Sequence, residues 1–532
     1  MTPFGLLERQ AQAGAERPLF ILPQKVRALW REDRNVWSYG DVFASVSALA
    51  AAYGAAGYGS GHRVAVLLEN RPAHFLHWLA LNSLGISVVP VNPDYTPDEL
   101  THLLTHSEAA LLVVLPSRLA QVEAVAGVCA VPVMVSGDGP PPAPERGEVQ
   151  DGECALIYTS GTTGTPKGCI LSNTYFLQWG NWYKAQRGAI SLRDGVERLL
   201  TPLPAFHVNA MAHSFMGMLS VGGAQVIVDR FHPSTWWDMA RETGASCFHY
   251  LGVMPAILLA IPPRPDDRDH GLRFGLGGGV HPDHHAAFEA RFGVPLLEGW
   301  AMTETGGGCL LCAAEDPRNI GQRCIGKASR PGPAMEIRVV GEDGADVPDG
   351  APGEMWVRAA GDDPAHGLFS GYLKNPQATA EVWQGGWFHT GDIVRRDAGG
   401  SLYFTDRKKN IIRRSGENIA AIEVESAIAS HPGVAQVAVV ATPEPLRDEE
   451  VLAVVVPRDG FDDVALADAI FAHCAGRLAY YKLPGIIAFV DRLPTTSTQK
   501  LKRGDLGALA TDPLAHPRGH DLRDRKQAMR KR

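Results

Sequence analysis

Hydroxyl groups, glycines and one lysine alternate in Tyr158–Gly168, which reads YTSGTTGTPKG. Glycines let successive backbone N–H groups turn toward one point, and such a concavity binds anions. The hydroxyls and the Lys167 ammonium add further donors, so a polyphosphate is the ligand that this stretch favours. The residues that we expect to contact it are Thr159, Ser160, Gly161, Thr162, Thr163, Gly164 and Lys167.

This stretch differs from the two most familiar phosphate-binding loops. A Walker A loop needs a glycine directly before its lysine, but Pro166 stands there. The dinucleotide pattern G-x-G-x-x-G is also missing from this segment. A polar loop without a ligand is the plain alternative. The hydroxyl-rich, glycine-spaced order that ends in Pro-Lys-Gly argues against it.

The loop resembles the phosphate-binding signature of the adenylate-forming enzymes, which include acyl-CoA synthetases, luciferases and the adenylation domains of peptide synthetases. The resemblance implies further motifs in a fixed order downstream. The chain carries EGWAMTET at Glu298–Thr305, WFHTGDI at Trp387–Ile393 and PTTSTQK at Pro494–Lys500. The matches extend from about residue 155 to 503, and their order and spacing make them specific.

Two of these motifs supply the residues with which the family holds ATP. By resemblance, Trp300 stacks on adenine in place of the more usual tyrosine, Thr303 contacts the α-phosphate, and Glu304 binds Mg²⁺. Mg²⁺ takes carboxylate and phosphate oxygens, which fits that assignment. The resemblance gives Asp392 both ribose hydroxyls, and a carboxylate has two oxygens for two such donors. Arg407 is implied to touch the nucleotide as well.

The last motif is implied to carry the catalytic lysine. The family loop usually ends in Gly-Lys, so Lys500 takes this role although Gln499 replaces the glycine. Lys502 lies close by, but the spacing favours Lys500.

Two segments are implied to serve the second half of the reaction. The family rotates its small C-terminal domain about a hinge two residues after the conserved arginine, which makes Lys409 the expected hinge. Rotation is expected to bring Ser415, Gly416 and Glu417 to the channel through which coenzyme A enters.

The acyl pocket is expected near Leu203–His213, which reads LPAFHVNAMAH. The segment resembles one in which a histidine, here His207, gates the pocket, and FHVNA looks closest to ligases of crotonobetaine-like small acids. Asn209 and His213 are four residues apart and share a face of a helix. That face is expected to look into the pocket and to favour short, polar acids, unless both side chains bond only to protein or water. The opposite wall is expected from Gly277, Gly278 and Gly279.

These motifs together predict an ATP-dependent acyl-CoA ligase that uses ATP, Mg²⁺, coenzyme A and a small carboxylic acid. The acid first forms an acyl-adenylate and pyrophosphate, and the acyl group then passes to coenzyme A. The chain ends soon after Lys500 without a carrier module, which favours coenzyme A over a carrier protein as acceptor. A stand-alone carrier-loading enzyme and an inactive nucleotide-binding relative are the alternatives. The expected catalytic residues are Lys500, Thr303, Glu304 and His207.

A mixed α/β fold must position these residues. Apolar runs such as Arg63–Glu69, Ser87–Pro93 and Ala110–Pro116 are typical of strands, and Pro72–Leu84 has helical spacing. This alternation predicts parallel sheets covered by helices.

Two domains are expected. Residues 1–405 form a large adenylating domain, whose part from about 330 to 405 has short strands typical of a small antiparallel unit. Residues 406–532 form a small, mobile α+β lid that carries the catalytic lysine.

Composition excludes several other classes of protein. With 532 residues, a net charge of −8 and a pI near 6.2, the chain is long enough for several domains and does not suggest a nucleic-acid partner. It has no apolar run of membrane-spanning length and no secretory signal, which predicts a soluble, cytoplasmic protein. A homodimer is left open.

Three remaining clusters are interpreted as structural. Cys309, Cys312 and Cys324 lack an evident fourth ligand for zinc and are expected to be reduced thiols. The HPDHH stretch from His281 is expected to open a helix, and the basic stretch Arg518–Arg532 is expected to be a solvated tail.

Overall fold

The computed structural model describes residues 1–159, 166–315, 317–328, 332–414, 417–444, 448–495 and 501–529. The chain divides into two compact units, residues 1–337 with 357–389, and residues 338–356 with 390–532. Several residues of the predicted site lie outside the described residues, namely Ser160, Gly161, Thr162, Thr163, Gly164, Ser415, Gly416 and Lys500.

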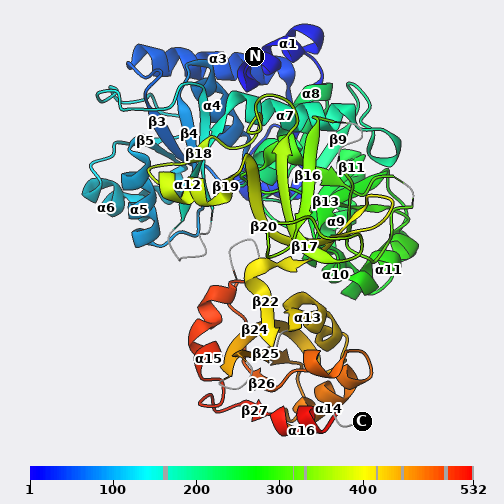
Figure 1. The fold of residues 1–532 in the computed structure, drawn as a ribbon. Coiled ribbons are helices and arrows are strands. Elements are labelled where there is room, and N and C mark those ends of the chain that lie inside the picture. Colours follow the sequence, from blue (N-terminus) through cyan, green and yellow to red (C-terminus); the bar gives the residue numbers. More distant parts are fainter. Residues whose placement is uncertain are drawn as a thin grey trace. The chain divides into compact units, whose positions relative to one another are not determined.

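Two largely parallel sheets form the first unit, as the alternating sequence predicts (Figure 1). One has the order β18-β8-β7-β4-β3-β5-β6, and the other has the order β14-β13-β12-β11-β9-β10-β1-β2. The strands of the first are β18 (Gly371–Tyr372), β8 (Lys167–Ser172), β7 (Glu153–Thr159), β4 (Ser87–Pro90), β3 (Arg63–Leu67), β5 (Ala109–Val114) and β6 (Val133–Val135). Those of the second are β14 (Leu311–Cys312), β13 (Leu296–Trp300), β12 (Phe274–Gly278), β11 (Cys247–Leu251), β9 (Arg198–Thr201), β10 (Ala224–Ile227), β1 (Pro18–Ile21) and β2 (Val36–Ser38).

Local sequence explains where these elements begin and end. Strand β4 is buried at every position, as expected for an apolar strand inside a parallel sheet. Strand β3 ends two residues before the predicted Glu69, which has a φ of 56° that no strand residue adopts. Pro72 opens a helix at a position where its missing N–H would have no partner in any case. The helices of this unit are α1 (Pro3–Gly14), α2 (Gln24–Trp30), α3 (Tyr39–Ala55), α4 (Pro72–Ser83), α5 (Pro97–Ser107), α6 (Leu119–Val128), α7 (Asn173–Ala185), α8 (Phe215–Val221), α9 (Trp236–Thr243), α10 (Val253–Ala260), α11 (Pro282–Phe292) and α12 (Pro376–Val382).

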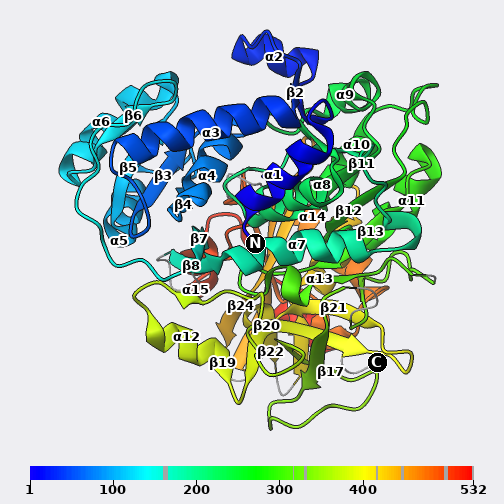
Figure 2. The same cartoon turned by 90° about the horizontal axis from the view of Figure 1, so that it is seen from above.

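Helix α7 runs from the first sheet to the second (Figure 2). It begins directly after β8, where the Ser172 side chain accepts a hydrogen bond from Tyr175 N at 3.2 Å and caps the helix. Helix α8 lies close to it, because a Cβ on Gly180 would stand 3.0 Å from the Met216 carbonyl oxygen. The glycine therefore lets α7 approach the segment that follows His207.

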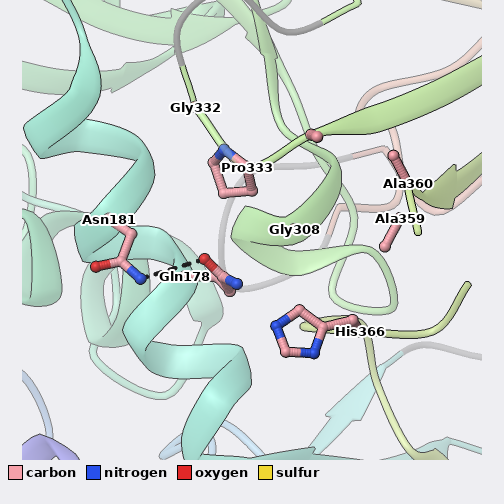
Figure 3. A pocket seen from close by; sticks show the side chains of 9 residues that line it. Gln178, Asn181, Gly308, Gly332, Pro333, Ala359, Ala360 and His366 are labelled. Carbon is pink, nitrogen blue, oxygen red and sulfur yellow. Dashed lines mark hydrogen bonds between the residues drawn. The ribbon is translucent and has the colours of Figure 1, made fainter. Parts of the chain in front are cut away.

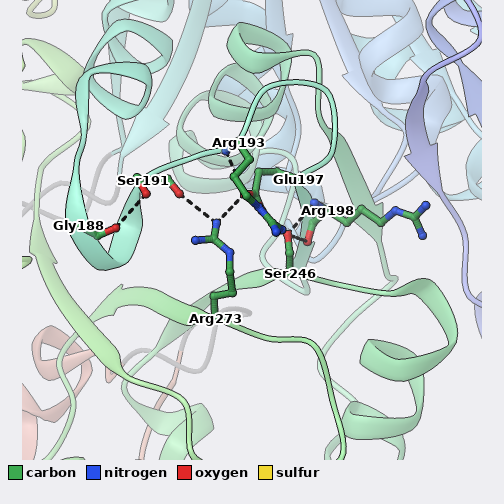
Figure 4. A network of polar contacts seen from close by, with 7 residues as sticks. All are labelled: Gly188, Ser191, Arg193, Glu197, Arg198, Ser246 and Arg273. Carbon is green, nitrogen blue, oxygen red and sulfur yellow. Dashed lines mark hydrogen bonds and ion pairs between the residues drawn. The ribbon is translucent and has the colours of Figure 1, made fainter.

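Glu197 forms hydrogen bonds that connect the amino ends of three neighbouring parallel strands (Figure 4). It stands directly before β9, and its carboxylate accepts hydrogen bonds from Ser246, directly before β11, and from Arg273, directly before β12, the latter at 2.6 Å. Arg193 donates to the same carboxylate at 2.7 Å. Burial alone would raise the pKa of Glu197, but these hydrogen bonds and the nearby arginine charge hold it below its usual value. The amino ends are thus fixed, and the carboxyl ends of these strands are left for a ligand, as is usual in open α/β sheets.

The second unit contains most of an antiparallel sheet followed by an α+β region, whereas the sequence placed the antiparallel strands in the first domain. The sheet contains β16 (Met335–Val340), β17 (Pro352–Ala359), β20 (Trp387–Arg396) and β21 (Leu402–Arg407). In the α+β region, β25 pairs antiparallel with β24 and parallel with β26. Its elements are β22 (Ile411–Arg414), β23 (Glu417–Ala420), α13 (Ala421–Ala429), β24 (Val434–Glu444), β25 (Asp448–Pro457), α14 (Asp463–Ala475), β26 (Ile486–Phe489), α15 (Gly507–Thr511), β27 (Gly519–Asp521) and α16 (Arg523–Met529).

For the described part of Arg518–Arg532, which ends at Met529, the prediction of a solvated tail is wrong. Lys526 in α16 is only 1% exposed, and its Nζ lies 2.5 Å from Glu450 Oε1, while Arg414 Nε lies 2.8 Å from Oε2 of the same carboxylate. Arg518 pairs with a further acidic residue, Asp463, at 2.5 Å. The basic residues thus bind carboxylates that are distant in sequence, and they join the C-terminal segment to the sheet.

The cysteine and histidine clusters have ordinary structural surroundings. Each of the eight cysteines is a free thiol. His281 caps α11, as predicted, by accepting a hydrogen bond from Asp283 N at 3.3 Å. In the part of the chain that the structure describes, no group of three His, Cys, Asp or Glu side chains could hold a metal ion. No helix among those residues is long and apolar enough to cross a membrane.

Candidate active site

The two ends of the predicted phosphate loop are held side by side by a β-ladder. Thr159 ends β7, Lys167 begins β8, and the two are paired across the antiparallel strands. The hydroxyls and glycines between these ends lie outside the described residues.

Tyr372, whose role the sequence analysis missed, contacts both Lys167 and Glu304, the predicted magnesium ligand. The Tyr372 hydroxyl donates to Glu304 Oε1 at 2.9 Å, and Lys167 Nζ stands 4.9 Å from the centre of the Tyr372 ring. The pKa of the Tyr372 hydroxyl is raised by burial and by the Glu304 charge, so it stays a donor. The signal for Tyr372 was weak, because one tyrosine in SGYLKN has no chemical pattern around it.

Thr303 and Trp300 are fixed on the same segment. The Tyr175 hydroxyl in α7 donates to the Thr303 carbonyl oxygen at 2.8 Å, and the Phe369 N–H donates to the Glu304 carbonyl oxygen at 2.8 Å. Trp300 ends β13 and is 6% exposed. The structure therefore brings Lys167, Thr303 and Glu304 to one part of the first unit, at the carboxyl end of a parallel strand.

Glu298 is a second residue whose role the sequence analysis missed. Its carboxylate accepts hydrogen bonds from Gly279 N at 3.1 Å and from Val280 N at 3.2 Å. Burial raises the pKa of Glu298. Gly279 has a φ of 80°, so a glycine is required where the chain turns at the end of β12. The signal was its place at the start of EGWAMTET, two residues before Trp300.

The three predicted wall glycines do not share one face of their sheet. Strand β12 pairs in parallel register with β11, with Tyr250 opposite Gly277, and a Cβ on Gly277 would lie 2.2 Å from the Tyr250 carbonyl oxygen. Because side chains alternate along a strand, Gly278 lies on the opposite face, the one that carries His249. The third glycine forms the turn described above. Gly278 is thus the one in a position to border the acyl side of the sheet.

The predicted pocket segment after His207 forms a π-helix at Asn209–Ser214 that leads into α8. His207, Val208 and Asn209 are partly exposed, whereas the residues that follow them are buried. One helical turn in a π-helix holds more residues than in an α-helix, and such turns occur often at functional sites. Asn209 and His213 nevertheless meet a common neighbour, His249.

His249 is the third residue that the sequence analysis missed. Its Nδ1 lies 3.0 Å from Asn209 Oδ1 and 2.8 Å from Ser214 Oγ, and its Nε2 lies 2.9 Å from the Tyr183 hydroxyl. Burial lowers the pKa of His249 to about 3, so the ring is neutral. A histidine in the middle of the apolar run CFHYL was the available signal.

His213 lies in a cluster of aromatic rings. Its ring centre is 4.9 Å from that of Trp179, 5.5 Å from that of Trp182, 5.0 Å from that of Tyr183 and 4.5 Å from that of His249. Burial, and then the neighbouring His249, lower the pKa of His213 well below its usual value. His213 Nε2 is buried without a hydrogen-bond partner among the described residues. Three of the four neighbours come from α7, and the fourth, His249, comes from β11.

The predicted ribose ligand belongs to the second unit. Asp392 is fully buried and stands opposite Arg407 across β20 and β21, with 2.6 Å between Arg407 Nε and Asp392 Oδ1. The residues of β20 just before Asp392 are held by Gly391 N, which donates to Glu354 Oε1 at 3.1 Å, and by Thr390 Oγ1, which donates to the Met355 carbonyl oxygen at 2.6 Å. The structure therefore brings together the two residues of this unit that the resemblance assigns to the nucleotide.

The predicted hinge residue lies in a short turn that a buried aspartate holds. Lys409 is in a 3₁₀ turn, Lys408–Asn410, directly after β21. Asp406, which is 2% exposed, accepts hydrogen bonds from Asn410 Nδ2 at 3.1 Å and from Ile422 N at 2.9 Å. Asp406 thus joins the turn to the start of α13. Of the predicted coenzyme A segment, Glu417 begins β23.

A cavity of about 310 Å³ lies beside α7 and contains none of the predicted site residues (Figure 3). Gln178 and Asn181 line it from the helix and bond to each other at 3.3 Å. Trp182 lies near both the cavity and His213, because a Cβ on Gly332 of the cavity would stand 3.0 Å from the Trp182 ring, whose centre is 5.5 Å from that of His213. The other lining residues are Gly308, Pro333, Ala334, Ala359, Ala360 and His366.

Most of this chain matches known protein families and relatives. The family model described as AMP-binding enzyme matches residues 7–373, and the one described as AMP-binding enzyme C-terminal domain matches residues 423–500. A sulfoacetate–CoA ligase from Cupriavidus necator is 33% identical over 94% of this chain and 96% of its own length. A crotonobetaine/carnitine–CoA ligase from Proteus mirabilis is 29% identical over 87% of this chain and 92% of its own length.

The fold is also that of solved structures. ATP-bound MatB from Rhodopseudomonas palustris has a TM-score of 0.79 to this chain at 24% identity, over 96% of this chain and 100% of that one. The mixed α/β fold predicted from the sequence is confirmed, and so is the resemblance read from the motifs. This chain belongs to the AMP-binding enzyme family.

Proposed function

We propose that this protein is an ATP-dependent ligase that joins a short, polar carboxylic acid to coenzyme A through an acyl-adenylate. The observation that carries the proposal is the meeting of Lys167, Tyr372 and Glu304, beside Thr303, at the carboxyl end of β13. This set offers a cation, a hydrogen-bond donor and a carboxylate where the family motifs expect the triphosphate. The relatives described above, which are named as CoA ligases, support the same reaction.

The reaction requires that a carboxylate attack the α-phosphate of ATP. Two unit charges about 4 Å apart repel by roughly 4 kcal/mol at an effective dielectric of 20. The site must offset this repulsion and stabilise a charge-rich transition state with preorganised donors. Lys167, the N–H groups of the phosphate loop and Lys500 are the donors proposed for this purpose. Water is not required as a reactant, and no side chain becomes acylated.

Glu304 is suited to hold the magnesium ion that the family uses. Its Oε1 accepts the Tyr372 hydrogen bond, which leaves Oε2 to bind the ion. Mg²⁺ is usually bound by one or two carboxylates together with substrate phosphates and waters, so one carboxylate is enough. When bound, the ion supplies positive charge to the phosphate oxygens.

A short, polar acid is supported by the side chains after His207. Asn209 and His213 put one amide and one imidazole where a fatty-acid pocket would need apolar groups, whereas both ring nitrogens of the neighbouring His249 already have protein partners. Burying these groups opposite an alkyl chain would cost about 1–3 kcal/mol for each one left unpaired. The relatives' substrates, sulfoacetate and crotonobetaine or carnitine, are short and polar as well.

The proposal is tested with a panel of acids scored by CoA-dependent release of AMP. The panel contains acetate, butyrate, palmitate, malonate, succinate, sulfoacetate and crotonobetaine, and Glu304→Gln serves as the variant that keeps the side-chain shape without its charge. We expect AMP release with at least one short, polar acid and a fall of about 10²–10³ in rate for the variant. Release of ADP instead, or AMP release only with palmitate, would overturn the proposal. Acid-dependent pyrophosphate exchange without thioester formation would favour a carrier protein as acceptor.

A further inference from the structure

We infer that the acyl pocket ends in a subsite for a second oxyanion on the acid, held by Asn209, His213 and Trp179. This inference rests on the proposed ligase function and names its substrate class. The acid would carry a carboxylate or sulfonate at the end remote from the one that is activated.

The subsite is rich in hydrogen-bond donors that have no acceptor. Asn209 uses its Oδ1 toward His249, and its Nδ2 has no partner among the described residues. Trp179 Nε1 and His213 Nε2 are both buried without a partner, and the two rings are 4.9 Å apart. An indole N–H can only donate. Within the described residues, none of the three is bonded to a carboxylate, and an oxyanion on the acid would supply an acceptor.

Tyr183 and His249 determine which end of the Asn209 amide is free. The Tyr183 hydroxyl can donate to His249 Nε2 at 2.9 Å, which leaves the proton of the neutral ring on Nδ1. In that tautomer the N–H can donate to Asn209 Oδ1 at 3.0 Å, beside Ser214 Oγ at 2.8 Å. The amide is thereby oriented with its NH₂ group away from His249. His249 is in this way a positioning residue for Asn209.

The distance from the reacting centre suits a short acid. The Tyr175 hydroxyl binds the carbonyl oxygen of Thr303, the residue expected at the α-phosphate, and Trp179 stands one helical turn further along α7. A helix rises 1.5 Å per residue, so these four residues span roughly 6 Å. A second acidic group on a short chain can therefore reach the free donors while the first is at the phosphate.

Two other distal groups fit less well. A quaternary ammonium group would need open aromatic faces, but the His213 ring already stands among the rings of Trp179, Trp182 and Tyr183. Such a group also has no lone pair, and an alkyl chain has none either, so both would leave the donors unpaired. An oxyanion pairs with several of them at once, and charge-assisted hydrogen bonds are the stronger kind.

The experiment compares acids of equal length in the full-length enzyme by CoA-dependent AMP release. The pairs are succinate with butyrate, and malonate with propionate, and crotonobetaine is the cationic probe. We expect kcat/KM for each dianionic acid to exceed that of its partner by about tenfold or more. Equal or lower values for the dianions would overturn the inference. If only butyrate or propionate is activated, the result supports the ligase function and refutes the subsite. If no acid of any kind yields AMP, both fall.

Three variants separate a binding role from a structural one. Trp179→Phe keeps the ring and removes only the N–H, and it should raise KM for succinate several-fold while leaving butyrate unchanged. Trp236→Phe is the matched control, since Trp236 Nε1 is also buried without a partner but lies in the core away from His213. Asn209→Asp is nearly isosteric and adds a negative charge. It should abolish the preference for dianions and favour crotonobetaine over succinate. A uniform loss with every acid in Trp179→Phe and Asn209→Asp would contradict the inference.

Discussion

The Tyr372 hydroxyl donates a hydrogen bond to Glu304 at 2.9 Å and joins residues that are 68 positions apart in the chain. The same tyrosine presents its ring to Lys167. A single side chain thus connects the end of the phosphate loop with the carboxylate proposed to hold magnesium.

Tyr372→Phe should weaken magnesium use without removing the ring that faces Lys167. A hydrogen bond to a charged group contributes about 1.5–3 kcal/mol, which corresponds to a fall of roughly 10–100-fold in kcat/KM. The magnesium concentration for half-maximal rate should rise. Tyr58→Phe is the control, because the Tyr58 hydroxyl is buried without a partner among the described residues. Equal magnesium dependence of wild type and Tyr372→Phe would contradict the role given to Tyr372.

Lys500→Ala should cripple adenylation and leave the transfer to coenzyme A nearly intact. Losing one preorganised donor of positive charge costs about 10²–10³ in rate. The two steps are separated by supplying preformed acyl-adenylate with coenzyme A. Lys502→Ala is the control for a nearby lysine. If thioester formation falls as far as adenylation, the assignment of Lys500 is wrong.

Lys409→Pro should spare adenylation and block thioester formation. Proline fixes φ near −65° and restricts the residue before it, so a turn that must change its backbone angles becomes locked. Lys409→Ala removes the same side chain but keeps the backbone free, and it should retain both half-reactions. The measurements are pyrophosphate exchange for the first step and thioester formation from acyl-adenylate for the second. Retention of both steps in Lys409→Pro would remove Lys409 as the hinge.

Lys526→Met should destabilise the second unit, because it leaves part of the buried Glu450 charge uncompensated. Breaking a buried pair typically costs about 3–5 kcal/mol, and we expect the lower end since Arg414 stays in place. Arg525→Ala removes the neighbouring cation, whose pair with Asp468 is exposed, and should change stability by less than about 1 kcal/mol. Urea unfolding followed by protease susceptibility of the C-terminal region measures both. Similar stability losses in the two variants would contradict a special role for Lys526.

The fold was largely predictable, because its strands and helices have local causes. Ala110–Pro116 is predicted as a strand and β5 covers Ala109–Val114, and Pro72 marks the start of α4 as a proline at a first helical position does. The ends of elements were less predictable. The strand from Arg63 stops early because Glu69 adopts a left-handed backbone conformation, which no apolar pattern reveals.

The site was predictable only where it is encoded in continuous motifs. Glu304 and Asp392 occur in such motifs. The roles of Tyr372 and His249, in contrast, depend on hydrogen-bond partners 68 and 40 residues away. The C-terminal basic stretch was misread for the same reason, since Lys526 finds Glu450 76 residues earlier. Sequence patterns report periodicity and spacing, whereas these pairs depend on the packing of whole sheets and helices.

The central claim is that a carboxylate oxygen of the acid attacks the α-phosphate of ATP. An acid labelled with ¹⁸O in its carboxylate tests this directly when the products are analysed by mass spectrometry. The account predicts one ¹⁸O atom in AMP for each thioester formed, because the bond to phosphorus is made by the acid's oxygen and coenzyme A later displaces it from carbon. Unlabelled AMP, or ¹⁸O found in inorganic phosphate together with ADP, would contradict it.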